Sequence, residues 1–196
     1  VLDIGTGTGL VALMAAQRGA GHVVAVEIDK MAAGQACENV RQSQWRDSIE
    51  VVCSDITKYT PDELKFDVIA CNPPFFRDSL RSPNAVRSQA RHNDSLSYEK
   101  LADTVLRLLA NDGTFNLVLP FDMADTFTLI AARRGLYMSK RTKVVTRQGV
   151  APKRVLLSFV KQQIVHVEED ELVMFDSNNA ETLDYISLVK DFYLKY

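Results

Sequence analysis

The stretch VLDIGTGTGL, residues 1–10, joins an apolar strand-like run to a turn that carries Gly5, Gly7 and Gly9. An alanine-rich helical stretch, VALMAAQRG, follows it directly. Glycines between a strand and a helix let backbone amides approach a ligand closely and aim the helix N-terminus at it. The opening unit therefore predicts a strand, turn and helix able to bind a nucleotide-like group, although some glycine turns serve only tight packing.

Further apolar and β-branched runs predict six more strands, and amphipathic stretches between them predict helices. The expected strands are Val1–Ile4, His22–Ile28, Ile49–Cys53, Phe66–Cys71, Thr114–Leu119, Tyr137–Thr146 and Arg154–Lys161. The expected helices after the first are Lys30–Gln42, capped by Asp29, then Ser97–Ala110, Asp125–Arg134 and the apolar end Thr182–Tyr196. Strands separated by helices indicate an α/β fold with a mostly parallel seven-stranded sheet and helices on both faces.

The last two strands are separated by only Gln148–Lys153, so we expect an antiparallel hairpin at the sheet edge, and Asn111-Asp112-Gly113 is expected to form a turn. No linker or repeat interrupts residues 1–196, which we therefore expect to form a single domain. Because the chain opens inside a strand, we also expect that upstream residues are missing.

Composition excludes several classes of protein. The chain has 196 residues, 46% apolar and 24% charged, which excludes a disordered chain and a disulfide miniprotein. The cysteines Cys37, Cys53 and Cys71 form no CxxC pair, so we expect buried thiols and no metal. No run approaches the ~18 apolar residues of a membrane span and no signal peptide is visible, so we expect a cytoplasmic protein without a membrane partner.

Acidic residues follow three of the expected strands, where open parallel sheets bind ligands. Asp3 precedes the glycine turn, and Glu27, 22 residues after Gly5, has the separation that suits hydrogen bonds to ribose hydroxyls. A cap on the next helix is the alternative for Glu27, but Asp29 is better placed for it. Asp55 either accepts from an adenine amino group or forms a turn before Thr57.

The sequence Asn72-Pro73-Pro74-Phe75 follows the fourth expected strand. The two prolines remove two backbone donors and stiffen the chain, leaving the Asn72 side-chain oxygen and the Pro73 carbonyl as fixed acceptors. Two adjacent acceptors suit an amine or amide nitrogen, and Phe75 offers a face on which a base can stack. A rigid Asn-Pro turn is the alternative, but it does not explain the nearby glycine turn and the attached aromatic ring.

Together GTGTG, Glu27, Asp55 and NPPF resemble the class I S-adenosylmethionine-dependent methyltransferases with a Rossmann-like fold that modify amino nitrogens. The resemblance implies that S-adenosylmethionine is the cofactor and that Asn72, Pro73 and Phe75 are catalytic. It implies cofactor binding by Asp3, Gly5, Thr6, Gly7, Gly9, Glu27, Ile28, Asp55, Ile56 and Asn72.

Basic residues gather in two segments although the net charge is −2. Arg77, Arg81, Arg87, Arg91 and His92 form the first, and eight basic residues with no acid lie between Arg133 and Arg154. Such segregation suits contact with a phosphate backbone, and a solvated basic face is the alternative. The predicted RNA-binding residues are Phe76, Arg87, Arg91, His92, Arg147, Lys153 and Arg154.

The longer pattern NPPFF, ARHNDSLSYEKLA and PKRVLLSF is similar to the bacterial tRNA1(Val) (adenine-37 N6)-methyltransferase group. This resemblance implies methylation of the N6 amine of adenosine 37 in a tRNA, by an enzyme we expect to be monomeric. The alternatives are a protein glutamine N5-methyltransferase, a methyltransferase for DNA or ribosomal RNA amines, and a non-catalytic module that binds adenine nucleotides.

Overall fold

The computed structural model describes residues 1–62, 64–73 and 96–194. Its eight strands form a single sheet in the order β3-β2-β1-β4-β5-β7-β6-β8. The strands are β1 Leu2–Ile4, β2 Val23–Glu27, β3 Ile49–Cys53, β4 Phe66–Cys71, β5 Leu109–Pro120, β6 Tyr137–Arg147, β7 Arg154–Val160 and β8 Glu168–Phe175. All neighbours pair in parallel except β7, which is antiparallel to both β5 and β6.

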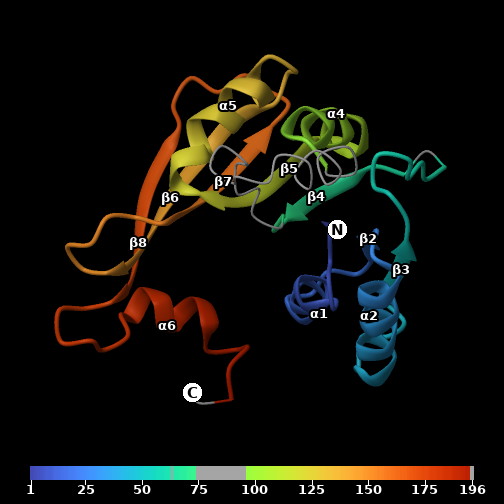
Figure 1. Cartoon of the computed structure of the whole chain (residues 1–196), viewed down its shortest axis with the longest axis horizontal. Helices are drawn as coiled ribbons and strands as arrows, with labels where there is room; N and C mark the ends of the chain where they lie inside the picture. Colours follow the sequence, from blue (N-terminus) through green and yellow to red (C-terminus); the bar gives the residue numbers. More distant parts are fainter. Residues whose placement is uncertain (63, 74–95, 195–196) are drawn as a thin grey trace, which may run out of the picture.

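Helices cover both faces of the sheet, so the predicted α/β class is confirmed. Helices α1 (Leu10–Gln17) and α2 (Lys30–Gln42) pack on one face, and α4 (Tyr98–Leu108) and α5 (Ala124–Ala132) pack on the other (Figure 1). Asp29 caps α2 as predicted, because its Oδ1 accepts from the Ala32 amide at 2.8 Å. The larger core lies under α4 and α5.

The sheet is one strand longer than predicted. The acidic run Glu168–Phe175 forms β8 at the edge, parallel to β6, so the β6–β7 hairpin does not form that edge. Lys140 Nζ lies 2.5 Å from Glu168 Oε1, and Lys143 Nζ lies 4.0 Å from Glu169 Oε2. The sequence did not reveal β8 because its first half, Glu168–Glu171, is acidic and exposed, and only Leu172–Phe175 is apolar and partly buried.

The predicted turn at Asn111-Asp112-Gly113 is wrong, because β5 already begins at Leu109. The register between β4 and β5 shifts there, so the extra residues form a bulge inside the strand. A Cβ atom on Gly113 would lie 2.9 Å from the Phe66 carbonyl oxygen, too close for any side chain. Gly113 is therefore needed because β4 and β5 approach each other closely at this point. In the sequence, a glycine required for such a contact looks the same as a glycine that forms a turn.

The C-terminal segment returns to the start of the fold. Helix α6 (Leu183–Val189) packs against β8 through the Phe175–Tyr185 ring pair, 6.2 Å between centroids. Gln17 Nε2 donates to the Asp191 carbonyl at 2.6 Å, and the Arg18 guanidinium lies 4.8 Å from the centre of the Phe192 ring. These contacts join α1 to residues more than 170 positions later in the chain.

Two further expectations concern thiols and membranes. Cys71 is buried as expected, but Cys37 and Cys53 are exposed, so that expectation is wrong for these two. Among the helices that the structure describes, none combines the length and apolar character needed to cross a membrane.

Candidate active site

The predicted site residues of the described segments gather at one edge of the sheet. Strands β2, β1 and β4 are adjacent and parallel, so their carboxyl ends, with Glu27, Gly5 and Asn72, open at the same edge. Two strand spacings separate the ends of β2 and β4, about 10 Å. The strand order reverses between β1 and β4, which is where open α/β sheets bind their ligands.

Backbone hydrogen bonds to β2 hold the glycine turn between β1 and α1 in place. The amides of Gly5 and Thr6 donate to the Val26 carbonyl at 2.9 and 3.1 Å, which ties the turn to β2. Gly7 has a φ of 58°, and a Cβ atom there would find no described atom within 4 Å. The turn therefore leaves open space above a left-handed backbone, and this space fits a bound ligand.

Glu27 occupies the end of β2 with its side chain almost buried, at 9% exposure. Its Oε2 accepts from the Gly7 amide at 2.8 Å, and its Oε1 accepts from the Asp29 amide at 2.9 Å. The helix cap that was the alternative for Glu27 is provided by Asp29 instead. Each carboxylate oxygen has a second lone-pair direction, so Glu27 keeps the capacity to accept from two hydroxyls.

Asp3 is buried below the glycine turn, at 2% exposure. Its Oδ2 accepts from Thr6 Oγ1 at 2.5 Å, a contact that places both predicted residues under the turn. Burial raises the pKa of Asp3 to about 6, and the charge of Glu27 adds to the rise. The hydrogen bonds from Thr6 and from the Ala12 amide act in the opposite direction but are weaker than the effect of burial.

This raised pKa predicts how stability depends on pH. Between about pH 4 and 6 the folded chain keeps a proton on Asp3 that the unfolded chain has lost, so the free energy of unfolding falls as pH rises. We expect the wild type to lose about 1.4 kcal/mol between pH 5 and 8 that Asp3→Asn does not lose. Urea denaturation of both proteins at the two pH values measures this difference, and parallel pH profiles would contradict it.

Asp55 follows β3 and begins a single helical turn. Its Oδ1 accepts from the amide and the hydroxyl of Thr57, at 2.9 and 2.8 Å, so the turn role that was left open is present. Partial burial raises the pKa of Asp55, but the hydrogen bonds from Thr57 and the charge of Lys58 outweigh it and hold this pKa below its usual value. A contact of Asp55 with adenine stays a prediction, as does cofactor binding by the buried Ile56 and the exposed Ile28.

Asn72 is exposed directly after β4, and Pro73 is buried beside it. Asn72 is one of the residues that line a groove of about 300 Å³, which Val11 of α1 also lines. Polar side chains of neighbouring strands share the groove, and Ser158 Oγ donates to Asn116 Oδ1 at 2.8 Å within it. Asn72 therefore presents an exposed side-chain amide at this edge of the sheet, and its role as an acceptor stays a prediction.

Five predicted site residues lie outside the described part of the chain, and their roles are untested: Phe75, Phe76, Arg87, Arg91 and His92.

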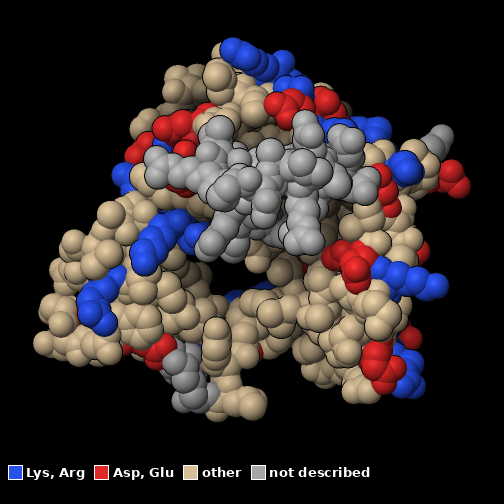
Figure 2. Space-filling model, viewed as in Figure 1, with Lys and Arg blue, Asp and Glu red and all other residues tan. Residues whose placement is uncertain are grey.

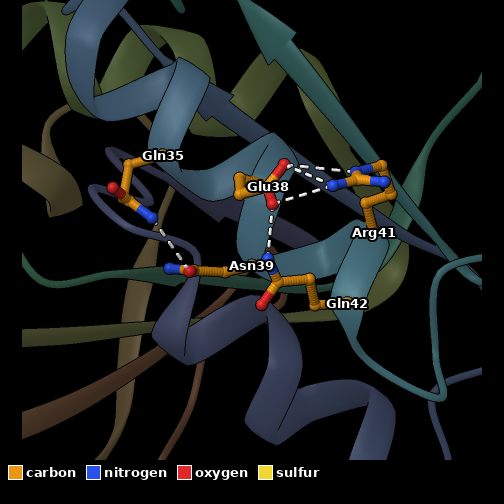
Figure 3. A network of polar contacts seen from close by, with 5 residues as sticks. All are labelled: Gln35, Glu38, Asn39, Arg41 and Gln42. Carbon is orange, nitrogen blue, oxygen red and sulfur yellow. Dashed lines mark hydrogen bonds and ion pairs between the residues drawn. The ribbon is translucent and has the colours of Figure 1, made fainter.

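Sequence reasoning missed Asn116 and Ser158. The signal for both was a polar residue inside an apolar strand, TFNLVL and RVLLSF. It also missed Asn39 of α2, whose Nδ2 donates to the Thr8 carbonyl of the glycine turn at 2.8 Å. Figure 3 shows Asn39 beside the exposed polar network of α2, where Gln35 Nε2 donates to its Oδ1 at 3.1 Å.

Seven of the eight basic residues between Arg133 and Arg154 fall into two groups, and the eighth, Arg133, is exposed at the end of α5. Four of the seven form ion pairs with acidic side chains: Arg134 with Asp103, Lys140 with Glu168 and Asp170, Arg141 with Asp125, and Lys143 with Glu169. The predicted RNA-binding residues Arg147, Lys153 and Arg154 lie where β6 ends and β7 begins. Arg154 pairs with Pro120 at the carboxyl end of β5, so this group lies at the same sheet edge as Asn72. Figure 2 shows Lys and Arg side chains in the area where Figure 1 draws the β6–β7 turn.

Comparison with known proteins identifies close relatives. A protein of Bacteroides fragilis named tRNA1(Val) (adenine(37)-N6)-methyltransferase is 49% identical over 100% of this chain and 83% of its own length. A protein of the same name from Histophilus somni is 37% identical over the same shares of both chains. The family model described as "Methyltransferase small domain" matches residues 1–119.

Solved structures share the fold at low sequence identity. A predicted O-methyltransferase from Agrobacterium tumefaciens has a TM-score of 0.74 at 20% identity, covering 96% of this chain and 87% of its own. A glycopeptide N-methyltransferase in complex with S-adenosylmethionine has a TM-score of 0.62 at 13% identity, covering 82% and 86%. Together with the relatives above, these findings confirm the predicted fold class and cofactor. The chain belongs to the tRNA1(Val) (adenine(37)-N6)-methyltransferase family, whose members use S-adenosylmethionine.

Proposed function

We propose that this chain methylates the N6 amine of adenosine 37 in a tRNA through Asn72 and Pro73. The observation that carries this assignment is the exposed Asn72 at the end of β4, at the sheet edge that also holds Glu27 and the glycine turn. The relatives that match the whole chain carry the tRNA1(Val) name, and this supports the choice of substrate.

The residues under the glycine turn fit the cofactor. Gly7 leaves open space above the turn, and Glu27 presents a carboxylate that is held in place by two backbone amides. Glu27 would accept from the ribose hydroxyls, and the backbone of Gly5–Gly9 would hold the methionine portion. When bound, S-adenosylmethionine supplies the methyl group as an electrophile.

The chain's own residues orient the target amine. Asn72 Oδ1 and the Pro73 carbonyl would accept the two amine hydrogens, which turns the nitrogen lone pair out of conjugation with the ring and toward the methyl group. Pro73 and Pro74 carry no backbone N–H, so no amide competes for these acceptors. Positioning of this kind lowers a barrier by up to ~7–11 kcal/mol when the geometry of attack is complete. The amine loses its proton after transfer, so no general base is required.

The basic residues at the β6–β7 turn favour an RNA substrate over a protein. Arg147 and Lys153 are exposed, and the Arg147 guanidinium donates to the Asn179 amide oxygen at 2.6 Å rather than to a carboxylate. A guanidinium held by a neutral partner keeps its charge available for a phosphate. The other basic residues of β6, Lys140, Arg141 and Lys143, are paired with acids, so their charges are already balanced by neighbouring carboxylates.

Neutralising Arg147 and Lys153 together is expected to weaken tRNA binding and its dependence on salt. Each lost phosphate contact lowers the slope of log affinity against log salt by ~0.7 on single-stranded RNA, so the double variant to Gln loses about 1.4. The matched control is Arg46→Gln with Arg133→Gln, which removes two exposed charges far from the β6–β7 turn. Filter binding at several salt concentrations measures both slopes, and equal slopes in the two double variants would contradict the proposed contact.

The function itself is tested by offering radiolabelled S-adenosylmethionine with tRNA, ribosomal RNA, DNA and a release factor in parallel. We expect label in tRNA as N6-methyladenosine at position 37. Label on a protein glutamine, with tRNA unlabelled, would replace this proposal with the glutamine methyltransferase alternative.

Three further expectations concern the location of the enzyme, its domain organisation and its oligomeric state. Because tRNA is the proposed substrate, we place the enzyme in the cytoplasm. We also propose that residues 1–196 act as one domain and as a monomer. The chain spans 83% of the length of the relatives from B. fragilis and H. somni.

A further inference from the structure

A single helical turn at residues 55–59 is supported at both ends by side chains. The amides of Lys58 and Tyr59 donate to the Asp55 carbonyl at 2.9 and 3.1 Å, which closes the turn. Asp55 Oδ1 accepts from Thr57 at the amide end. We call residues 55–59 the Asp55 turn. It carries two of the predicted cofactor-binding residues, Asp55 and Ile56.

Arg107 of α4 supports the carbonyl end of this turn. Its Nη1 donates to the Tyr59 carbonyl at 2.8 Å, and its Nη2 lies 3.5 Å from the carbonyl oxygens of Ile56 and Thr57. One isolated helical turn leaves its last carbonyls without partners, because no further turn follows to donate to them. A guanidinium placed there satisfies these acceptors and complements the negative end of the turn dipole.

Helix α4 holds Arg107 in a fixed place. Leu101, Val105 and Leu108 are buried at 2% exposure or less, so one face of the helix is locked into the core. Ser97 caps the other end by accepting from the Lys100 amide at 3.3 Å. Lys100 lies seven residues before Arg107, hence on the same side of the helix, and its charge lowers the pKa of Asp55. Both basic side chains of this α4 face therefore act on the Asp55 turn.

We propose that Arg107 is a positioning residue that sets the affinity for S-adenosylmethionine by holding the Asp55 turn in its binding conformation. The proposal rests on the function proposed above, in which this turn lies at the adenine end of the cofactor. In this role Arg107 acts through the Asp55 turn and not by contact with the cofactor or the amine. Because the amine is held by Asn72 on β4, loss of Arg107 affects cofactor binding and leaves the rate at saturating cofactor unchanged.

Arg107→Met tests this role, because methionine keeps the apolar stem and removes every donor. We expect the dissociation constant for S-adenosylmethionine, measured by calorimetry, to rise about tenfold. The kcat at saturating cofactor and tRNA is expected to stay within about twofold of wild type. Arg107→Lys, which still offers a donor to the Tyr59 carbonyl, is expected to restore part of the affinity.

Arg134→Met is the matched control, since Arg134 also holds α4, through Asp103 at 2.8 Å, but does not contact the Asp55 turn in the described structure. We expect its affinity to equal that of wild type. Combining Arg107→Met with Asp55→Ala is expected to weaken binding by less than the product of the two single effects, because both act on one turn.

The outcomes of these experiments distinguish a failure of the role proposed for Arg107 from a failure of the cofactor site itself. Unchanged affinity in Arg107→Met, an equal loss in Arg134→Met, or fully multiplicative effects with Asp55→Ala would each overturn the role of Arg107 while leaving the methyl-transfer function intact. Absence of any binding heat with the wild-type chain would overturn the cofactor site itself, and the role of Arg107 with it.

Discussion

Asn72→Ala is expected to reduce kcat for tRNA methylation by at least about 100-fold, the usual effect of removing one group that is positioned for the transition state. The alanine variant keeps the backbone at the end of β4 but loses the side-chain acceptor that orients the amine. Although the resemblance also places Asn72 among the cofactor-binding residues, the affinity for S-adenosylmethionine is expected to stay within about twofold of wild type, because Glu27 and the glycine turn supply the main contacts. Single-turnover assays and calorimetry measure the two quantities separately.

Asn111→Ala provides the matched control, since Asn111 is exposed near the start of β5, at the opposite end of the sheet from Asn72. Its methylation rate is expected to equal that of wild type. If the Asn72 variant kept near-normal turnover, NPPF would be a structural turn and the proposed amine site would be wrong.

Glu27→Ala is expected to raise the dissociation constant for S-adenosylmethionine by about 10- to 150-fold, which corresponds to ~1.5–3 kcal/mol for hydrogen bonds to a charged group. Two effects add. The ribose loses its acceptor, and the Gly7 amide, which donates to Glu27 Oε2 at 2.8 Å, loses the contact that fixes the glycine turn. Calorimetry with S-adenosylhomocysteine gives the same comparison without turnover.

Glu38→Ala removes the same charge from the exposed face of α2. There Glu38 accepts from Arg41 at 2.8 Å and also from Gln42, as Figure 3 shows. Its cofactor affinity is expected to match wild type. Unchanged affinity in a folded Glu27→Ala variant would contradict the ribose assignment and leave Glu27 with a purely structural role in the turn.

Four strands of the parallel half, β1 to β4, could be predicted to within about one residue at each end, whereas the start of β5 could not. The strands Ile49–Cys53 and Phe66–Cys71 have the bounds that their apolar runs predict. These strands bury side chains against helices on one or both faces of the sheet. Their apolar composition alone is therefore enough to predict them. The glycine turn, Asp3, Glu27 and Asn72 were also predictable, because each follows a recognisable strand and parallel strands bring such ends together.

The remainder depends on contacts between distant segments. Strand β8 was not predicted because the first half of EEDELVMF is acidic and exposed, and these acids lie opposite Lys140 and Lys143 of β6, 26 or more positions earlier in the chain. The same pairing divides the basic segment, which the sequence presents as a single patch. Arg107 gave no signal either, since a basic residue in the last turn of a helix is common and its three carbonyl partners lie about 50 positions earlier.

The position of β7 between β5 and β6 affects how the chain folds as it is synthesised. Strand β6 leaves the ribosome before β7 but has no place in the sheet until β7 has paired with β5. Synthesis of the 13 residues that follow Arg147, up to Val160, takes roughly 1–3 seconds at ordinary rates of translation. During that interval β6 has no β-sheet partner in the growing chain, and its Lys140, Arg141 and Lys143 discourage pairing with the edges of other nascent chains.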